Sequence, residues 1–235
     1  MALPKLKTNE YTLTVPSTQE EVKFRPFLVR EQKILMIAEE SNDEKQIAAS
    51  MARLVSDCTF QSVDAMTSPM FDIEYIFLQI RAKSVGEKIE IDITCPDDNE
   101  TRTKIEIDLN EINIQMSLEH SKSIKLTDDI VLNFRYPMMK DFENLNNDAG
   151  EFEQTMNMIY NCIESVQSGD ELIQRIDMTY DEIVEFIDSF NTAQLESVVN
   201  FFQTMPKLRH VVDVVNPKTK KKSELLLEGL ESFLA

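Results

Sequence analysis

The sequence of 235 residues predicts an α+β fold. Two patterns support this class: apolar residues alternate with polar ones in several stretches, and between these stretches they recur at helical spacing. With 42% hydrophobic and 28% charged residues, the composition is that of a folded protein. The length suits one large domain or two small ones.

The amino-terminal region is predicted to form a β-hairpin followed by amphipathic helices. The alternating apolar residues are Tyr11, Leu13 and Val15 in the first strand and Val22, Phe24 and Phe27 in the second. Residues 29–40 are rich in helix formers, and Ser41 and Asn42 are suitable caps for the next helix. Ser68 is expected to cap a third helix, with Pro69 in its first turn.

The middle of the chain is predicted to form a small antiparallel sheet. Isoleucines alternate with polar residues over 89–95 and again over 103–109, with a turn at 96–100. Because the alternation continues over 112–136, we expect those residues to extend the same sheet.

We expect a mixed α/β domain over residues 1–137 and a helical region with a carboxyl-terminal hairpin over 138–235, with one continuous domain as the alternative. One helical stripe runs from Phe152 to Ile163, and Leu172–Ile176 fits either a short strand or a connector. Thr179-Tyr180-Asp181-Glu182 is a capping box at a helix start.

After that capping box the sequence continues with a second helix and a hairpin. The second helix restarts at Asn191 or Thr192 and ends before Pro206. Residues 211–215 and 225–227 form the arms of the terminal hairpin, which has a lysine-rich tip.

Charge and cysteine content argue against several classes of protein. A formal charge of −18 disfavours binding to nucleic acid, because phosphates would be repelled. We expect no secretory signal at the amino terminus and no membrane-spanning helix. Cys58, Cys95 and Cys162 are widely separated, so free, mostly buried thiols in a reducing cytosol are expected.

The residues that could support catalysis are few, so we expect no catalytic, cofactor-binding or metal-binding residues. His120 is expected to be a solvated loop residue, and four glycines do not supply a phosphate-binding loop. Cys95 precedes a turn that contains Asp97 and Asp98, but no second cysteine follows at zinc-ligand spacing. A small acidic metal-dependent enzyme using Cys95 and Asp98 remains an alternative, as does an acidic mimic of DNA.

Adjacent apolar pairs point instead to interaction with another protein. Each pair lies on an element that can bury one face, so one member could contact a partner; a helix buried on two sides is the equally weighted alternative. The candidate partner-binding residues are Phe201, Phe202, Met138, Met139, Phe233 and Leu234.

Several stretches together resemble the baseplate hub family of T-even-type bacteriophages. The most distinctive is Lys23–Met36, which contains Phe24-Arg25-Pro26-Phe27-Leu28. The other stretches are residues 38–41, 71–78, 81–87, 201–202, 205–208 and 228–233. The similarity extends from about residue 22 to the end of the chain.

This resemblance implies a non-enzymatic protein of a contractile tail, made in the host cytoplasm. It would be a component or assembly factor of the baseplate hub, with other hub proteins or the tape-measure protein as partners. A transient chaperone that is absent from the mature virion is the alternative. Its negative charge would suit either a subunit or a factor that covers a basic partner.

Overall fold

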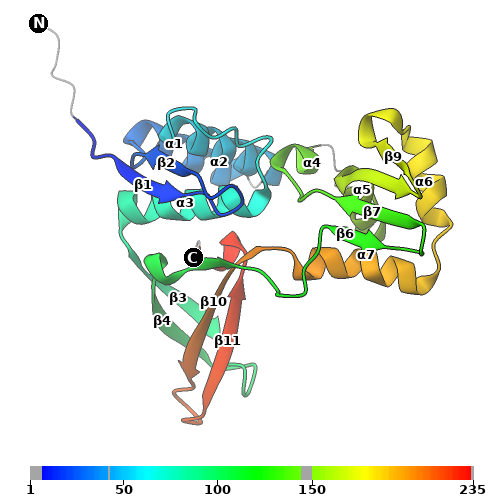
Figure 1. Ribbon diagram of the computed structural model, residues 1–235. Coiled ribbons are helices and arrows are strands. Elements are labelled where there is room, and N and C mark those ends of the chain that lie inside the picture. Colours follow the sequence, from blue (N-terminus) through cyan, green and yellow to red (C-terminus); the bar gives the residue numbers. More distant parts are fainter. Residues whose placement is uncertain (1–6, 42, 144–149, 234–235) are drawn as a thin grey trace, which may run out of the picture. The chain divides into compact units, whose positions relative to one another are not determined.

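The computed structural model describes residues 7–41, 43–143 and 150–233 (Figure 1). The chain divides into two compact units. Unit 1 runs to Gln115 and resumes at Lys207, whereas unit 2 comprises Met116–Pro206. These units do not follow the division expected after residue 137, because the last hairpin returns to pair with a strand of unit 1.

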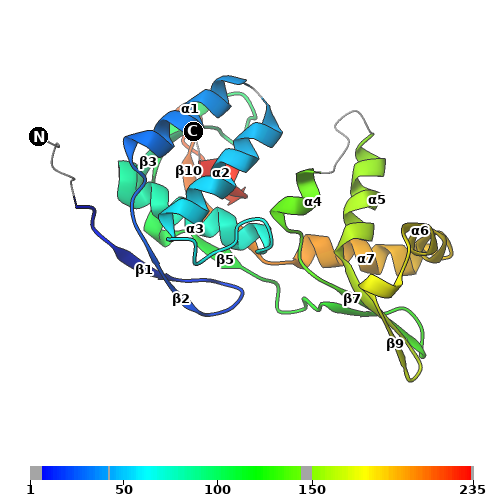
Figure 2. The ribbon, with the colours of Figure 1, turned by 90° about the horizontal axis from the view of Figure 1, so that it is seen from above.

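The first part of unit 1 is the predicted hairpin followed by helices. The elements are β1 (Tyr11–Thr14), β2 (Glu21–Phe24), α1 (Val29–Ser41), α2 (Glu44–Cys58) and α3 (Met70–Val85). The helix α2 contacts both α1 and α3, and Figure 2 shows α1 and α2 side by side. The buried face of α3 includes Ile73, Ile76 and Ile80, each fully buried, so α3 forms the centre of this unit's core.

Two caps differ from the expectation. The side chain of Asp43 caps α2, accepting from the backbone N–H groups of Lys45 and Gln46, and Asn42 lies outside the described residues. Pro69 takes the N-cap position of α3 without a side-chain bond, because the Ser68 hydroxyl donates to a carbonyl upstream instead. Local patterns located both helix starts but not the residue that caps them.

Unit 1 also contains two long hairpins, which lie side by side in Figure 1. The first is β3 (Lys88–Thr94) with β4 (Arg102–Asp108), and the second is β10 (Lys207–Val215) with β11 (Lys222–Glu228). The second hairpin also pairs with β5 (Asn113–Gln115). One face of each hairpin is buried, as the alternation of isoleucines and valines predicts. Short 3₁₀ turns follow the hairpins at Leu109–Glu111 and Leu230–Phe233.

The tips of these hairpins are joined by hydrogen bonds. The fully buried Asn216 donates through its side-chain amide to Asp97 at 2.8 Å and to Asp98 at 3.0 Å. Hydrogen bonds from Thr101 and Glu100 also hold the pKa of the Asp98 carboxyl far below its usual value. The two carboxylates therefore connect secondary structure rather than simply face solvent.

Unit 2 is an antiparallel sheet with helices, built around one apolar core. The strand order is β6-β7-β8-β9. The strands are β6 (Ser123–Lys125), β7 (Ile130–Phe134), β8 (Ile163–Ser168) and β9 (Glu171–Gln174). The helices are α4 (Met139–Glu143), α5 (Glu151–Cys162), α6 (Tyr180–Asp188) and α7 (Thr192–Thr204), and a 3₁₀ turn covers Arg175–Asp177. The capping box predicted at Thr179 is confirmed, and the helix expected to restart at Asn191 or Thr192 begins at Thr192 with Asn191 as its cap.

The sheet of unit 2 differs from the sequence expectation in two ways. The strands expected over 112–136 are divided between two sheets, because β5 pairs with β10 while β6 and β7 pair in unit 2. The helical stripe expected to reach Ile163 ends at Cys162, and Ile163 begins a strand. Leu172 lies in a strand, which resolves the choice between strand and connector.

A partly buried carboxylate on α3 has an unusual pKa. The pKa of Glu74 is raised to about 7, chiefly by burial, and the nearby Glu231 and Glu228 carboxylates act in the same direction. The backbone N–H of Leu230 and the ammonium of Lys207 oppose this shift. Protonation of Glu74 therefore favours the folded state of unit 1.

We expect Glu74→Gln to stabilise unit 1 at pH 8 by about 1 to 3 kcal/mol, with the difference vanishing below about pH 4.5. Because the folded-state pKa is raised, the stabilising contribution of Glu74 is complete at low pH and is lost as the pH rises through about 7. Urea unfolding at pH 4.5, 6 and 8 measures this.

Glu228→Gln is the matched control, because hydrogen bonds from Lys207 and Arg209 hold the pKa of Glu228 below its usual value even though burial opposes them. This variant should be less stable than wild type at pH 8. A Glu74→Gln variant with the same pH dependence as wild type would contradict the assignment.

Candidate interaction site

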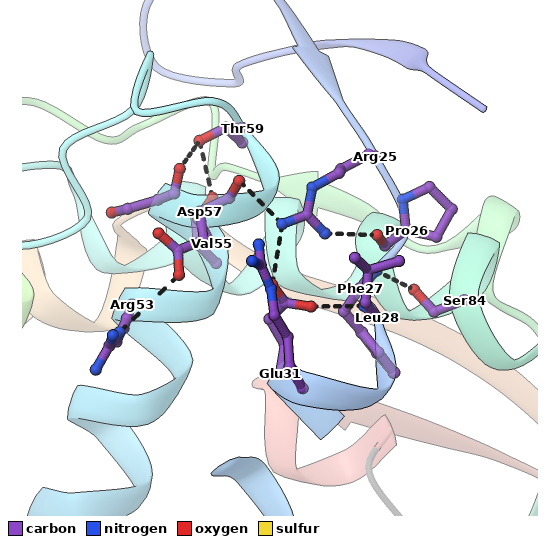
Figure 3. Close-up of polar contacts among 12 residues, drawn as sticks. Arg25, Pro26, Phe27, Leu28, Glu31, Arg53, Val55, Asp57, Thr59 and Ser84 are labelled. Carbon is purple, nitrogen blue, oxygen red and sulfur yellow. Dashed lines mark hydrogen bonds and ion pairs between the residues drawn. The ribbon is translucent and has the colours of Figure 1, made fainter. Parts of the chain in front are cut away.

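A buried arginine joins β2 to the two helices that follow it. Arg25 comes directly after β2 and is 7% exposed (Figure 3). Its backbone N–H donates to the Cys58 carbonyl at 3.0 Å. Its guanidinium donates to the carbonyls of Pro26 and Asp57 and to the Glu31 carboxylate at 3.0 Å. We call this set of contacts the Arg25 clip; it connects the end of β2 to the start of α1 and the end of α2.

The carboxylate in this clip also caps α1. Glu31 is 3% exposed and accepts a hydrogen bond from the backbone N–H of Leu28 at 2.7 Å. Although burial raises the pKa of Glu31, hydrogen bonds from Arg25, Arg30 and Leu28 keep the pKa below its usual value. Glu31 is therefore charged at neutral pH, so its contact with Arg25 is a buried ion pair.

Unit 2 contains a second clip with the same kinds of partner. The backbone N–H of Arg135, which follows β7, donates to the Cys162 carbonyl at 2.9 Å. The guanidinium of Arg135 donates to the carbonyls of Tyr136 and Asn161 and forms two bonds, of 2.7 and 2.8 Å, with Asp141. We call this set the Arg135 clip. In each clip the acidic residue lies six positions after the arginine. Two of the three carbonyls come from the last two residues of a helix, and the third comes from the residue after the arginine.

Other parts of the chain repeat in the same order. In α3 the third residue, Asp72, accepts a hydrogen bond from the backbone N–H of Ser17 in the first hairpin turn, at 3.0 Å. In α7 the third residue, Gln194, donates to the Leu126 carbonyl at the turn between β6 and β7, at 3.1 Å. Each of these helices leads into a long hairpin and then a 3₁₀ turn. The chain therefore contains a structural repeat.

The repeat has no fixed period in the sequence, because the spacing between counterparts varies. Arg25 and Arg135 are 110 positions apart, Cys58 and Cys162 are 104 apart, and the tip prolines of the long hairpins are 121 apart. A short sequence pattern could have revealed the repeat: a Phe-Arg pair with an acidic residue six positions after the arginine.

The structure places the predicted partner-binding residues in different environments. Phe201, Met139 and Phe233 are at most 2% exposed and belong to the core. Phe202 and Met138 are partly exposed. Leu234 lies outside the described residues. One member of each adjacent pair is thus buried, so Phe201, Met139 and Phe233 belong to the core rather than to an exposed surface.

Phe201 lies in an aromatic cluster that includes His120. The centroid of the Phe201 ring is 4.9 Å from that of Phe134 and 5.1 Å from that of His120, and the imidazole also stacks on Tyr136. The Nδ1 atom of His120 is 3.0 Å from the Thr204 hydroxyl. Burial lowers the pKa of His120. The expected solvated loop histidine is therefore a packed residue.

An open groove of about 880 Å³ runs between α7 and β6 in unit 2. Its lining includes Ser121, Ser123 and Lys125 on one side and Glu196, Asn200 and Gln203 on the other. Because β6 is an edge strand, its outer side is not paired within the sheet, and its residues form part of the groove lining. A polar groove beside a strand edge can accept an extended polypeptide.

The chemically reactive groups are engaged within the fold. The three cysteines are free and buried as predicted, and burial raises the pKa of Cys58 to about 11 and that of Cys162 to about 12. Across residues 7–41, 43–143 and 150–233, histidine, cysteine and acidic side chains form no group of three or more that could hold a metal. In the same ranges, no helix has the length and apolarity needed to cross a membrane.

These features define an α+β protein whose buried polar groups hold its own elements together and whose accessible features suit contacts with other proteins. The chain matches the T4 bacteriophage base plate protein family over residues 8–235 and belongs to that family. The match confirms the resemblance at the level of the baseplate family. Comparison with curated proteins and with solved structures gave no match.

We expect Arg25→Ala to lower the free energy of unfolding of unit 1 by about 3 kcal/mol, because it leaves the buried Glu31 carboxylate without its ion-pair partner. Hydrogen exchange of the α1 and α2 amides in increasing urea measures the loss, and the amides of unit 2 serve as an internal reference.

Arg30→Ala is the control for this prediction. Arg30 contacts the same carboxylate, but its side chain is 69% exposed, so little change is expected. If Arg25→Ala and Arg30→Ala lost equal hydrogen-exchange protection, the burial of Arg25 would not be the reason for its stabilising effect.

Proposed function

We propose that this protein is a non-enzymatic component or assembly factor of the baseplate hub and acts by contacts with other hub proteins or the tape-measure protein. The observation that carries the proposal is the family match, which spans almost the whole chain. Membership of a baseplate family implies a structural or assembly role and contacts with other baseplate proteins.

The surface of unit 1 supports a role in protein contacts. Apolar side chains on one side of α1 are exposed: Val29 at 66%, Met36 at 52% and Ile37 at 67%. Exposed apolar residues that recur at helical spacing are typical of a surface that another chain covers.

The second candidate function is a transient chaperone that leaves before the virion is complete. The formal charge of −18 is compatible with this role, because a strongly acidic protein can steer and shield a basic partner during assembly, and it equally suits a subunit seated against a basic neighbour. The metal-dependent enzyme gains no support from the described residues: Cys95 is fully buried, and Asp98 is occupied by hydrogen bonds.

Quantitative mass spectrometry of purified virions and of unassembled hub complexes from infected cells separates these roles. A hub component should be present in virions at a fixed ratio to other hub proteins. A chaperone should be enriched in partial complexes and absent from virions. Absence from both fractions would contradict the proposal.

We expect Phe202→Ser to weaken co-purification with hub proteins at least tenfold while unit 2 remains folded. Phe202 is the partly exposed member of its pair, and its ring also packs edge-on against Phe134 and Phe201, so its replacement costs some core packing. Phe201→Ser would remove a buried ring and leave a larger cavity in the core. Pull-down with each purified hub protein, alongside circular dichroism, measures both effects.

Phe152→Ser is the matched control, because Phe152 is 75% exposed and lies on α5 in the same unit. Unchanged co-purification of folded Phe202→Ser would remove this residue from the interface.

A further inference from the structure

The structural repeat makes the two long hairpins counterparts, so their outer faces can be compared position by position. Both tips begin with a proline, Pro96 or Pro217, followed three positions later by a residue with left-handed φ. These are Asn99 at 54° and Lys220 at 64°. In each tip the residue before the proline accepts a hydrogen bond from this left-handed residue.

The outer face of β3–β4 is a ladder of charges. Its cross-strand ion pairs are Lys88 with Glu106, Lys104 with Glu90 and Arg102 with Asp92. Alternating charges of this kind are typical of a sheet face that remains in water.

The outer face of β10–β11 is apolar at one cross-strand position of this ladder, and the pairs Arg209–Glu228 and Lys222–Asp213 keep charges on either side of it. Val211, six positions before its tip proline, takes the place of Glu90, and it lies opposite Leu226 as Glu90 lies opposite Glu106. Val211 is 53% exposed and Leu226 is 50% exposed. Val215, also 53% exposed, is on the same face nearer the tip, but Asp213 lies between it and Val211 and pairs with Lys222 as Asp92 pairs with Arg102. The two copies therefore share a backbone but differ in what their outer faces offer.

Two further features lie next to this apolar face. The strand β11 is at the edge of its sheet, in the order β11-β10-β5, so it has unpaired backbone groups along its outer side. Lys218, Lys220 and Lys221 are exposed at the tip, in a protein with a formal charge of −18. These three lysines form a cluster of positive charge, and the Asp97 and Asp98 carboxylates lie on the side of the tip that faces the other hairpin.

We propose that β11 and the outer face of its hairpin bind an extended segment of a partner protein, one that combines an apolar stretch with acidic residues at one end. The segment would add to the sheet through main-chain hydrogen bonds. Its apolar side chains would cover Val211 and Leu226, and its acidic end would meet the lysine tip. In the virus the partner would be another baseplate protein, so this last step rests on the proposed function.

The direct test uses fluorescent peptides and the full-length protein. Two peptides contain the stretch Val-Thr-Val-Thr-Val, one with three aspartates before it and the other with three aspartates after it. Two control peptides carry three lysines in place of the aspartates. Fluorescence anisotropy should show that one aspartate peptide binds at least tenfold more tightly than its lysine counterpart, with affinity falling as salt increases. Equal binding of both kinds, or binding of neither, would overturn the proposal.

Variants locate the binding to this face. Val211→Glu combined with Leu226→Lys introduces charges of the kind that the counterpart hairpin carries, and should weaken aspartate-peptide binding at least tenfold. Val211→Thr with Leu226→Thr removes the apolar contact without new charge, so it remains informative if the charged pair disturbs the fold. Lys218→Gln with Lys221→Gln should reduce the salt dependence.

The matched control changes the other hairpin: Lys104→Thr with Glu106→Thr should leave binding unchanged. Unchanged binding to folded Val211→Thr/Leu226→Thr would overturn the proposed surface.

Binding assays with individual purified baseplate proteins separate the two proposals. Equal binding of a hub protein to wild type and to folded Val211→Thr/Leu226→Thr would overturn this surface but leave the proposed function standing. Specific peptide binding without binding to any hub protein would support the surface and count against the proposed function.

Discussion

The buried arginine clip is the interaction on which each half of the fold depends. A strand that ends and a helix that begins both leave backbone groups without partners, and Arg25 and Glu31 satisfy several of them at the same place. Burial makes the ion pair costly to break, because removal of either partner leaves an unpaired charge. The paths of β2, α1 and α2 are therefore fixed together rather than one at a time.

The same clip serves two different surroundings. After Cys162 the chain continues directly as β8 and widens the sheet of unit 2. After Cys58 it turns through Phe60 and Gln61, which both have left-handed φ, and proceeds to α3 without a strand. The chain segment that follows each clip can therefore differ, while the hydrogen bonds from the arginine to the last two helical carbonyls stay the same.

Local rules explain which parts of this structure could be predicted from sequence. The capping box at Thr179 and the alternation in the long hairpins depend on residues close in sequence, and both were predicted. The β8 strand, the packing of His120 and the burial of Met139 depend on segments that meet only in the fold. The Arg25 clip combines both kinds of contact: Arg25 and Glu31 are close in sequence, but the Asp57 and Cys58 carbonyls are not.

Repetition within one chain gives a comparison that a single structure normally lacks. The two hairpins share tip geometry and strand pairing, so the backbone alone does not require the difference between Glu90 and Val211. Exposed valine and leucine reduce solubility unless another chain covers them, whereas the charged face of β3–β4 shows that the architecture accommodates charge at the same position. Contact with another chain would account for the apolar face, and in a baseplate protein such contacts form the assembly itself.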